Sequence, residues 1–293
     1  MKKKKKGSLF DIILFVAMIA VAVITLFPFL TVVAKSVSDA RYVLSGSVGV
    51  IPKGFQLDTI KFVLSRPEFR SAFAVSVAET LIGTAIAMIL TVLAAYPLSK
   101  PKLKGRKACL YFFVFIMLFN AGMVPKYLLY RSLKLTNTIW ALILPSALSV
   151  SNMLIVKNYF ETLPEAIEEA AMIDGASTMQ TLFHVVLPMS KPVLATITLF
   201  YAVGYWNDYF NGVMYITDPN MRSLQHYIYD LLTVTKDASS LSDNLGNIEA
   251  LAAISSEGIR CATILLSTIP ILIVYPRLQK YFVKGITIGS VKG

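Results

Sequence analysis

Long apolar runs, separated by short polar or basic stretches, make up most of this chain. At about 1.5 Å per helical residue, a run of about 20 residues crosses the hydrocarbon core of a bilayer, which is about 30 Å thick. The pattern therefore predicts an all-α membrane protein with six transmembrane helices. We place them at residues 9–33, 71–98, about 109–124, 138–160, about 193–217 and about 258–281.

The first run follows a group of lysines, Lys2 to Lys6. A basic start and an apolar centre are also typical of secretory signals, but there the apolar part is only about 7–15 residues long. The run from Leu9 to about Val33 exceeds this and is long enough to span a membrane. We therefore predict an uncleaved first span, with the basic N-terminus at residues 1–8 in the cytoplasm.

Basic residues concentrate again in the short stretch after the second span, KPKLKGRK at residues 100–107. Short loops rich in lysine and arginine stay on the cytoplasmic side of a membrane. With six spans, both termini and the loop at residues 161–192 then also lie in the cytoplasm. The predicted organisation is a six-span domain at residues 9–285, followed by a cytoplasmic C-terminal tail at residues 286–293.

Composition agrees with a membrane protein: 56% of the residues are apolar, 15% are charged, and the mean hydropathy is +0.65. The net charge of +11 does not indicate nucleic-acid binding, because the basic residues gather at the ends of apolar runs. Cys109 and Cys261 lie at or inside apolar runs, without the spacing of a metal site. These positions indicate that the two cysteines pack in the membrane and do not form a disulfide or a metal site.

One polar insert between apolar runs, EAAMIDGASTMQTLFHVVLP at residues 169–188, differs from an ordinary connection. Acidic residues follow Pro164, as suits the start of a helix, and Asp174-Gly175 predicts its end. A second helical pattern covers Ala176 to Val186, and Pro188 ends or kinks it. The sequence therefore predicts a helix–turn–helix outside the bilayer, whose small residues allow another protein to approach closely. An amphipathic connector without a partner is the alternative.

The spacing Glu169-Ala-Ala, Gly175, Val185-Val-Leu-Pro188 resembles the EAA motif of permease subunits of ABC importers. That family usually has isoleucine where Val185 stands, which is a conservative difference. Within it, the chain resembles carbohydrate permeases of the maltose-permease type, especially those for oligosaccharides in Gram-positive bacteria. Further segments that carry this resemblance are residues 119–125, 135–140, 144–145, 205–207 and 291–293.

The resemblance implies the ABC type I importer permease fold, with a cytoplasmic coupling helix between spans 4 and 5. It implies a subunit in the plasma membrane of a bacterium that moves a sugar or oligosaccharide into the cytoplasm by alternating access. The implied partners are membrane lipid, a second homologous permease, two copies of an ABC ATPase, and a lipid-anchored or periplasmic sugar-binding protein. ATP and Mg²⁺ would bind to the ATPase subunits and not to this chain.

By the same resemblance, the EAA stretch contacts the ATPase, and we expect Glu169 and Gly175 to carry the coupling. A similar C-terminal tail inserts between the ATPase subunits in maltose-type permeases, which implies contacts for Lys284, Gly285 and Lys292; a frayed tail is the alternative. Its glycines and lysines suit an extended segment. The full set of expected coupling residues is Glu168, Glu169, Ala170, Ala171, Asp174, Gly175, Ala176, Leu187 and Pro188.

Catalytic motifs are missing from the sequence, which has no GxxxxGK[ST], HExxH or GxSxG. The chain therefore lacks a P-loop for nucleotide phosphates, and we predict no catalytic and no metal-binding residues. A membrane enzyme is disfavoured on the same ground. The energy for transport must come from a separate ATPase subunit.

Polar side chains inside the predicted spans are candidates for a substrate pathway, because they are costly in lipid. In the fifth span, Tyr201, Tyr205 and Asp208 share one helical face. Aromatic rings and polar groups together hold sugars, so this face predicts a sugar path. Contacts between helices and interfacial aromatic residues are the alternative. The candidates are Tyr201, Tyr205, Trp206, Asn207, Asp208 and Asn211, with Glu79 and Asn120 in other spans.

Two questions stay open at the level of sequence. Residues 224–232 form an amphipathic helical pattern, which predicts either a lid over the ends of the spans or part of a face for a binding protein. The solute could also be something other than a sugar, within the same class of importer. A stand-alone secondary transporter is disfavoured, because neither an ion-coupling site nor an inverted repeat is visible.

Overall fold

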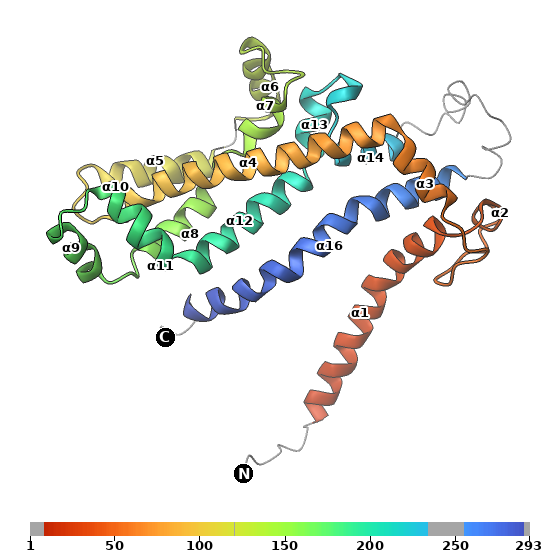
Figure 1. Ribbon diagram of the computed structural model, residues 1–293, viewed down its shortest axis with the longest axis horizontal. Helices are drawn as coiled ribbons and strands as arrows, with labels where there is room; N and C mark the ends of the chain where they lie inside the picture. The colour runs from red at the N-terminus through yellow and green to blue at the C-terminus, as the bar shows by residue number, and fades with distance from the viewer. Residues whose placement is uncertain (1–8, 120, 234–254, 290–293) are drawn as a thin grey trace. The chain divides into compact units, whose positions relative to one another are not determined.

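The computed structural model describes residues 9–119, 121–233 and 255–289, and every regular element within these ranges is a helix (Figure 1). Contacts divide the chain into two compact units. One comprises residues 1–66 and 230–269, and the other comprises residues 67–229 and 270–293. The second unit contains the loop of residues 161–192 and the polar fifth-span residues that the sequence singles out.

In the first unit, helix α1 (Leu9–Ser36) is exposed along nearly its whole length. Its window of highest hydropathy has no buried residue. A helix that is apolar all round needs lipid or another protein against it. Lys35 at its end pairs with Glu257 at 2.7 Å, and an isolated β-bridge joins Ser38 to Phe55. The short helices α2 (Ala40–Leu44) and α3 (Asp58–Ser65) complete this part.

The second unit is built around helix α4 (Pro67–Ser99), which packs along α8 (Val150–Phe160) and α12 (Lys191–Trp206) (Figure 1). Small residues allow this close approach. Ala87 and Ala95 are fully buried on α4, and at Gly83 the backbone lies directly against the Tyr205 ring. Glycine and alanine let helices in a membrane pack closely, which is the role of these positions.

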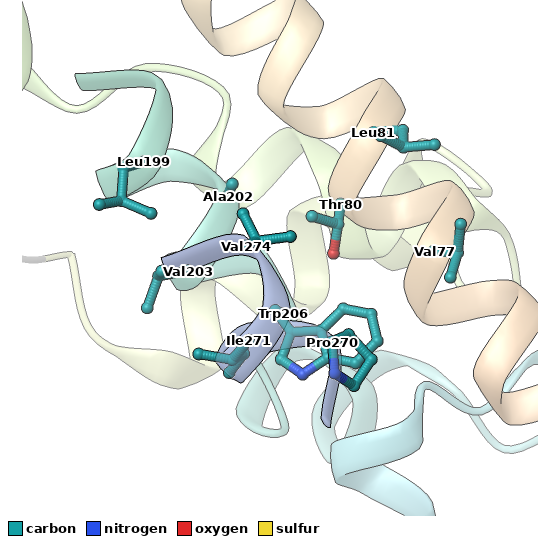
Figure 2. A pocket seen from close by; sticks show the side chains of 10 residues that line it. All are labelled: Val77, Thr80, Leu81, Leu199, Ala202, Val203, Trp206, Pro270, Ile271 and Val274. Atoms are coloured by element: carbon teal, nitrogen blue, oxygen red, sulfur yellow. The ribbon is translucent and has the colours of Figure 1, made fainter. Parts of the chain in front are cut away.

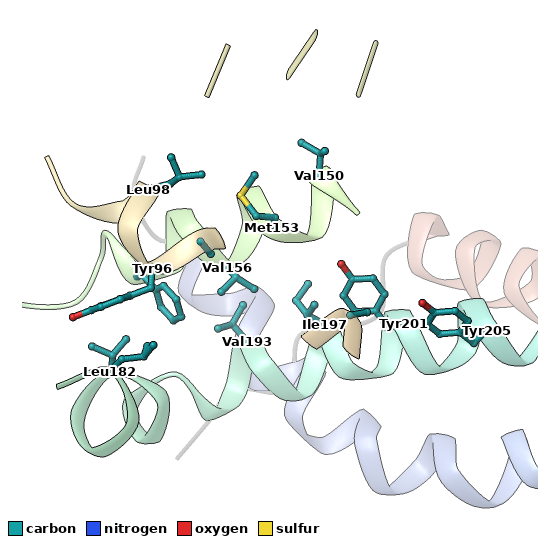
Figure 3. Packing of buried hydrophobic residues seen from close by; sticks show 14 residues of the cluster. Tyr96, Leu98, Val150, Met153, Val156, Leu182, Val193, Ile197, Tyr201 and Tyr205 are labelled. Carbon is teal, nitrogen blue, oxygen red and sulfur yellow. The ribbon is translucent and has the colours of Figure 1, made fainter. Parts of the chain in front are cut away.

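One hydrophobic core holds α4, α8 and α12 together with the 161–192 loop (Figure 3). From the loop, the π-helical turn η2 (Leu182–Val186) places two buried side chains into this core. The loop is therefore packed directly onto these helices. The buried residues of the core are Ala87, Ala95, Tyr96, Leu98, Val150, Met153, Val156, Phe160, Leu182, Val186, Val193, Ile197, Tyr201 and Tyr205.

Six segments of the described residues are long and apolar enough to cross a membrane, if each bent helix pair counts as one span. Three are single helices, at Phe10–Ser36, Pro67–Ser99 and Ser256–Val274. The other three are pairs bent by 109°, 50° and 85°. These pairs are α5 (Arg106–Leu118) with α6 (Met123–Ser132), α7 (Ile139–Ile143) and η1 (Leu144–Ser146) with α8, and Thr178–Met189 with α12.

The third and fifth spans are broken where the sequence predicts continuous helices. Helix α5 ends at Leu118, and α6 begins after Gly122, whose φ of +80° favours glycine. Helix α12 ends at Trp206, and α13 (Phe210–Tyr215) begins only after a short unwound stretch. The fourth span bends near Pro145, as the proline predicts.

Two further elements bear on the predictions. Helix α14 (Leu224–Thr233) matches the amphipathic pattern and follows the short turn η3 (Pro219–Met221). Helix α16 (Ser256–Gly289) continues well past the predicted end of the sixth span. Residues 281–289 are therefore helical, and the expectation of an extended segment is wrong as far as Gly289. Single glycines such as Gly285 cost a helix only about 1 kcal/mol, so they do not stop it.

Candidate functional site

The loop of residues 161–192 contains two helical segments joined at a glycine. Helix α9 (Glu165–Ile173) ends in a Schellman motif, in which the Gly175 amide donates to the Met172 carbonyl at 3.1 Å. The Ala176 amide donates to the Ala171 carbonyl at 2.9 Å in the same motif. Gly175 has a φ of +84°, a conformation that costs other residues about 1–2 kcal/mol. The glycine is therefore required by the shape of the turn.

The second segment starts at a capping box, in which Ser177 and Gln180 bond each other's backbone. It comprises α10 (Thr178–Thr181), the turn η2 and α11 (Leu187–Met189). It then meets α12 at 85°. This segment therefore does not continue in the direction of α12. The break occurs at Ser190, which is buried and donates its amide to the Val186 carbonyl at 3.0 Å.

The two neighbouring glutamates of α9 face different surroundings. Glu169 is exposed, whereas Glu168 is buried beneath the loop. Residues that follow each other on a helix point about 100° apart, which explains the difference. On the outer side, large apolar side chains are exposed, and Ile173 is 86% exposed. Exposed apolar groups of this kind, grouped on one loop, are typical of a protein-binding surface. They are Ile167, Met172, Ile173, Met179 and Phe183.

Beneath the loop, Glu168 is held by the end of α4. The Lys100 ammonium lies 2.5 Å from both of its carboxylate oxygens, and the Tyr96 hydroxyl donates to one of them at 3.2 Å. The same ammonium lies over the Tyr96 ring, 4.7 Å from its centroid. A second charged group joins Arg106 and Lys157 to Glu161 at the end of α8. The loop is thus attached to the spans by packing and by charge.

On the membrane side, a cavity of about 460 Å³ lies between α8 and α12. Tyr201 shares a 2.7 Å hydrogen bond with the Thr91 hydroxyl and accepts the Ser149 amide at 2.9 Å. Tyr205 donates to the Ile143 carbonyl at 3.0 Å. Both rings are therefore fixed. The lining is Pro145, Ser146, Leu148, Ser149, Asn152, Phe200, Tyr201, Gly204, Tyr205, Asp208 and Asn211.

The charged group of this cavity is Asp208, which lies in the unwound stretch between α12 and α13. Its carboxylate accepts the Asn211 amide at 3.1 Å and also bonds the Asn211 side chain. Together with Asn152, these groups offer donors and acceptors beside two aromatic rings. Fixed rings with convergent polar groups can bind a hydroxyl-rich ligand.

A second, apolar cavity of about 180 Å³ lies on the other side of α12 (Figure 2). Side chains of α4, α12 and the 270–274 part of α16 line it, among them Thr80, Trp206 and Pro270. The Trp206 ring meets Phe73 edge-on, with centroids 6.0 Å apart. Trp206 is therefore part of apolar packing and does not face the cavity of Tyr201 and Tyr205.

Comparison with known proteins identifies the family. The family model described as binding-protein-dependent transport system inner membrane component matches residues 2–288. The chain belongs to this family. As a member it is a membrane-embedded, non-catalytic component, and ATP hydrolysis belongs to a separate ATPase subunit.

Relatives of this membrane component include proteins of similar length. The chain is 42% identical to Protein LplC of Bacillus subtilis (strain 168) over all of its own length and 98% of that protein. It is 38% identical to the polygalacturonan/rhamnogalacturonan transport system permease protein YtcP of the same organism, with 98% and 100% coverage.

A solved structure has a fold similar to that of this chain. The chain resembles one chain of a bacterial ABC transporter involved in the import of the acidic polysaccharide alginate, with a TM-score of 0.85 and 32% identity. The match covers 96% of this chain and 99% of that chain. The predicted ABC type I permease fold is thereby confirmed.

The structure places the remaining predicted site residues as follows. Asn207 is exposed beyond the end of α12, next to Asp208. Glu79 is fully buried on α4 and does not line the cavity, and in the described part of the chain neither of its carboxylate oxygens has a hydrogen-bond partner. Asn120 and Lys292 lie outside the described residues. Lys284 and Gly285 lie in α16.

Sequence reasoning missed several residues that the structure brings to these two sites. Lys100 and Arg106 stand in the basic stretch after α4 and pair with Glu168 and Glu161 of the loop. Thr91, Ser149 and Asn152 are ordinary polar residues of apolar runs. No periodicity or spacing links them to the fifth span, because the contacts join segments far apart in the chain.

Proposed function

We propose that this chain is one of two permease subunits of an ATP-driven importer that carries a sugar or oligosaccharide into the cytoplasm. The observation that carries the proposal is the cavity with fixed Tyr201 and Tyr205 rings beside Asp208, Asn211 and Asn152. Rings stack on the apolar faces of sugars while carboxylate and amide groups bond hydroxyls. The polygalacturonan/rhamnogalacturonan and alginate transport named for two of the similar proteins supports the same substrate class.

In this proposal both termini lie in the cytoplasm, together with the loop of residues 161–192. The basic stretch at residues 100–107 supports this orientation. A second permease completes the pathway, two ATPase subunits bind beneath, and a sugar-binding protein delivers the solute from outside. ATP and Mg²⁺ act on the ATPase subunits.

Coupling follows from how the loop is attached. The exposed surface of α9, with Glu169 and Ile173, is available to an ATPase, and its inner surface is fixed to α4. Closure of the ATPase dimer would therefore move α9, and the packed core would carry that movement to α8 and α12. Packed helices shift as rigid bodies between two states, which is the alternation that transport requires.

The test uses the complete assembly in nanodiscs and proteoliposomes, with the partner permease, the ATPase and a binding protein loaded with defined oligosaccharides. We expect a loaded binding protein to stimulate ATP hydrolysis and to support uptake. Stimulation only by a polyamine, amino acid or phosphate would replace the sugar by that solute. If no complex with an ATPase forms, the importer assignment is refuted.

In the same assembly, Gly175→Val tests the role of the turn after α9. A Cβ at this position would meet no atom within 4 Å, so the first effect of the change is on the backbone. Valine disfavours a φ of +84° by about 1–2 kcal/mol or more, which distorts the turn after α9. We expect normal membrane insertion, continued ATP hydrolysis and much less sugar imported for each ATP. Wild-type uptake by this variant would refute the role of the turn.

A further inference from the structure

Lys100 and Glu168 form a contact between the cytoplasmic loop and the longest helix of the second unit. The ammonium is 2.5 Å from both carboxylate oxygens, and the Glu168 side chain is 9% exposed. Tyr96 adds a hydrogen bond of 3.2 Å and an aromatic face for the ammonium. Both carboxylate oxygens of Glu168 therefore have partners in α4 or in the residue that follows it. The Glu168 side chain points away from the outer surface of α9.

Helix α4 leads from this contact directly to the cavity. It is a single helix of 33 residues, which corresponds to a rod about 50 Å long. On its way it contacts both cavity tyrosines. Thr91 bonds the Tyr201 hydroxyl at 2.7 Å, and Gly83 lies against the Tyr205 ring. A displacement of the Lys100 end of α4 therefore reaches the two rings that line the cavity.

Stability alone does not explain a charged pair at this place. A well-packed apolar pair of similar size is often as stabilising as a buried ion pair, because burying charges is costly. An ion pair fixes direction and distance through its charge-assisted hydrogen bonds, and burial of the Glu168 carboxylate makes it costly to leave that charge without its partner. These are the properties of a mechanical link between two elements that move together.

We propose that Lys100 and Glu168 are positioning residues that form a strut, through which movement of α9 displaces α4 and, with it, Tyr201 and Tyr205. This inference rests on the proposed function, since it assigns a path to its coupling. It also assigns different roles to two adjacent glutamates. Glu169 faces outward toward a partner, and Glu168 holds the helix to the spans.

The experiment compares Lys100→Met, Glu168→Gln and the exchanged pair Lys100→Glu with Glu168→Lys in the complete assembly. Lys102→Met is the matched control, because Lys102 is exposed in the same basic stretch as Lys100. The readout is the amount of sugar imported for each ATP hydrolysed, which a loss of folded protein alone does not change. Association with the ATPase is measured separately by size-exclusion chromatography.

We expect each single variant to lower the sugar imported per ATP by about fivefold or more, which is the lower end of typical coupling between sites. The exchanged pair should recover most of this loss, and Lys102→Met should match wild type. Wild-type values in Lys100→Met overturn the proposal. So does a loss in both single variants, in transport or in assembly, that the exchanged pair does not recover.

A second readout needs no sugar. A fluorescent probe at Leu133→Cys, in a Cys109→Ser background, lies on an exposed side chain beyond the end of α6. ATP should change its fluorescence in wild type and much less in Lys100→Met. An equal change in both overturns the strut, whatever the solute proves to be. A wild-type change without stimulation by any sugar-loaded protein would instead count against the proposed substrate class.

Discussion

Gly83→Ala is the sharpest test of the packing around the cavity. A Cβ at this position would lie 2.7 Å from Tyr205 Cζ and 2.8 Å from both of its Cε atoms. Carbon atoms pack best at about 3.5–4.0 Å, so the ring would have to move by about 1 Å. It has little freedom to do so, because Tyr205 is 2% exposed and its hydroxyl is bonded to the Ile143 carbonyl. Overpacking of this kind costs about 1–3 kcal/mol.

The assay is thermal unfolding of the purified assembly, followed by uptake of the identified sugar. Gly204→Ala is the control, since Gly204 also lines the cavity but its Cβ would meet no atom within 4 Å. We expect Gly83→Ala to lower the unfolding midpoint by a few degrees and to reduce uptake. Gly204→Ala should leave the midpoint unchanged or raise it, because alanine favours a helix by about 1 kcal/mol. An unchanged midpoint in Gly83→Ala would refute the close approach of α4 and α12.

Two further predictions concern the cavity. Tyr201→Phe removes the hydroxyl that accepts a hydrogen bond from the Ser149 amide and bonds Thr91. A buried polar group then loses its partner, which costs about 1–3 kcal/mol of stability. Thermal unfolding should show this loss as a lower midpoint, and a midpoint equal to wild type would contradict it. Asp208→Asn removes the charge of the cavity lining and keeps its shape. Uptake of acidic oligosaccharides should therefore rise relative to neutral ones, because the Asp208 carboxylate no longer repels their carboxylates. Parallel uptake of a uronate and a neutral oligosaccharide checks the ratio, and an unchanged ratio would show that Asp208 does not face the solute.

Local signals predict the loop well. The stop at Asp174-Gly175 is confirmed by a Schellman motif, and the amphipathic pattern near residue 224 is confirmed by α14. Both depend on neighbouring residues, whose preferences are readable from the sequence. The apolar runs likewise predict the spans, because every span needs about 20 mainly apolar residues to cross the hydrocarbon core.

Contacts between distant segments could not be predicted in the same way. The face shared by Tyr201, Tyr205 and Asp208 assumes one continuous helix, but α12 ends at Trp206. All three residues still line the cavity, whereas Trp206 packs on the opposite side. The pairing of Lys100 with Glu168 joins residues 68 positions apart. The sequence shows that both are charged, but not which opposite charge each one meets. The helical continuation to Gly289 arises because isolated glycines weaken a helix without ending it.

The unwound stretch between α12 and α13 has a consequence for how a solute is selected. Polar side chains of Asp208, Asn211 and Asn152 line the cavity beside this stretch, and such groups bind water when no other polar ligand is present. Under the proposed function, water therefore occupies the cavity before a solute arrives. A sugar that enters would replace these water molecules with its own hydroxyls, which form hydrogen bonds of similar strength, so the net gain in free energy would be small. A passage of this kind would accept many related sugars and release each quickly, which would leave the choice among them to the protein that delivers the solute.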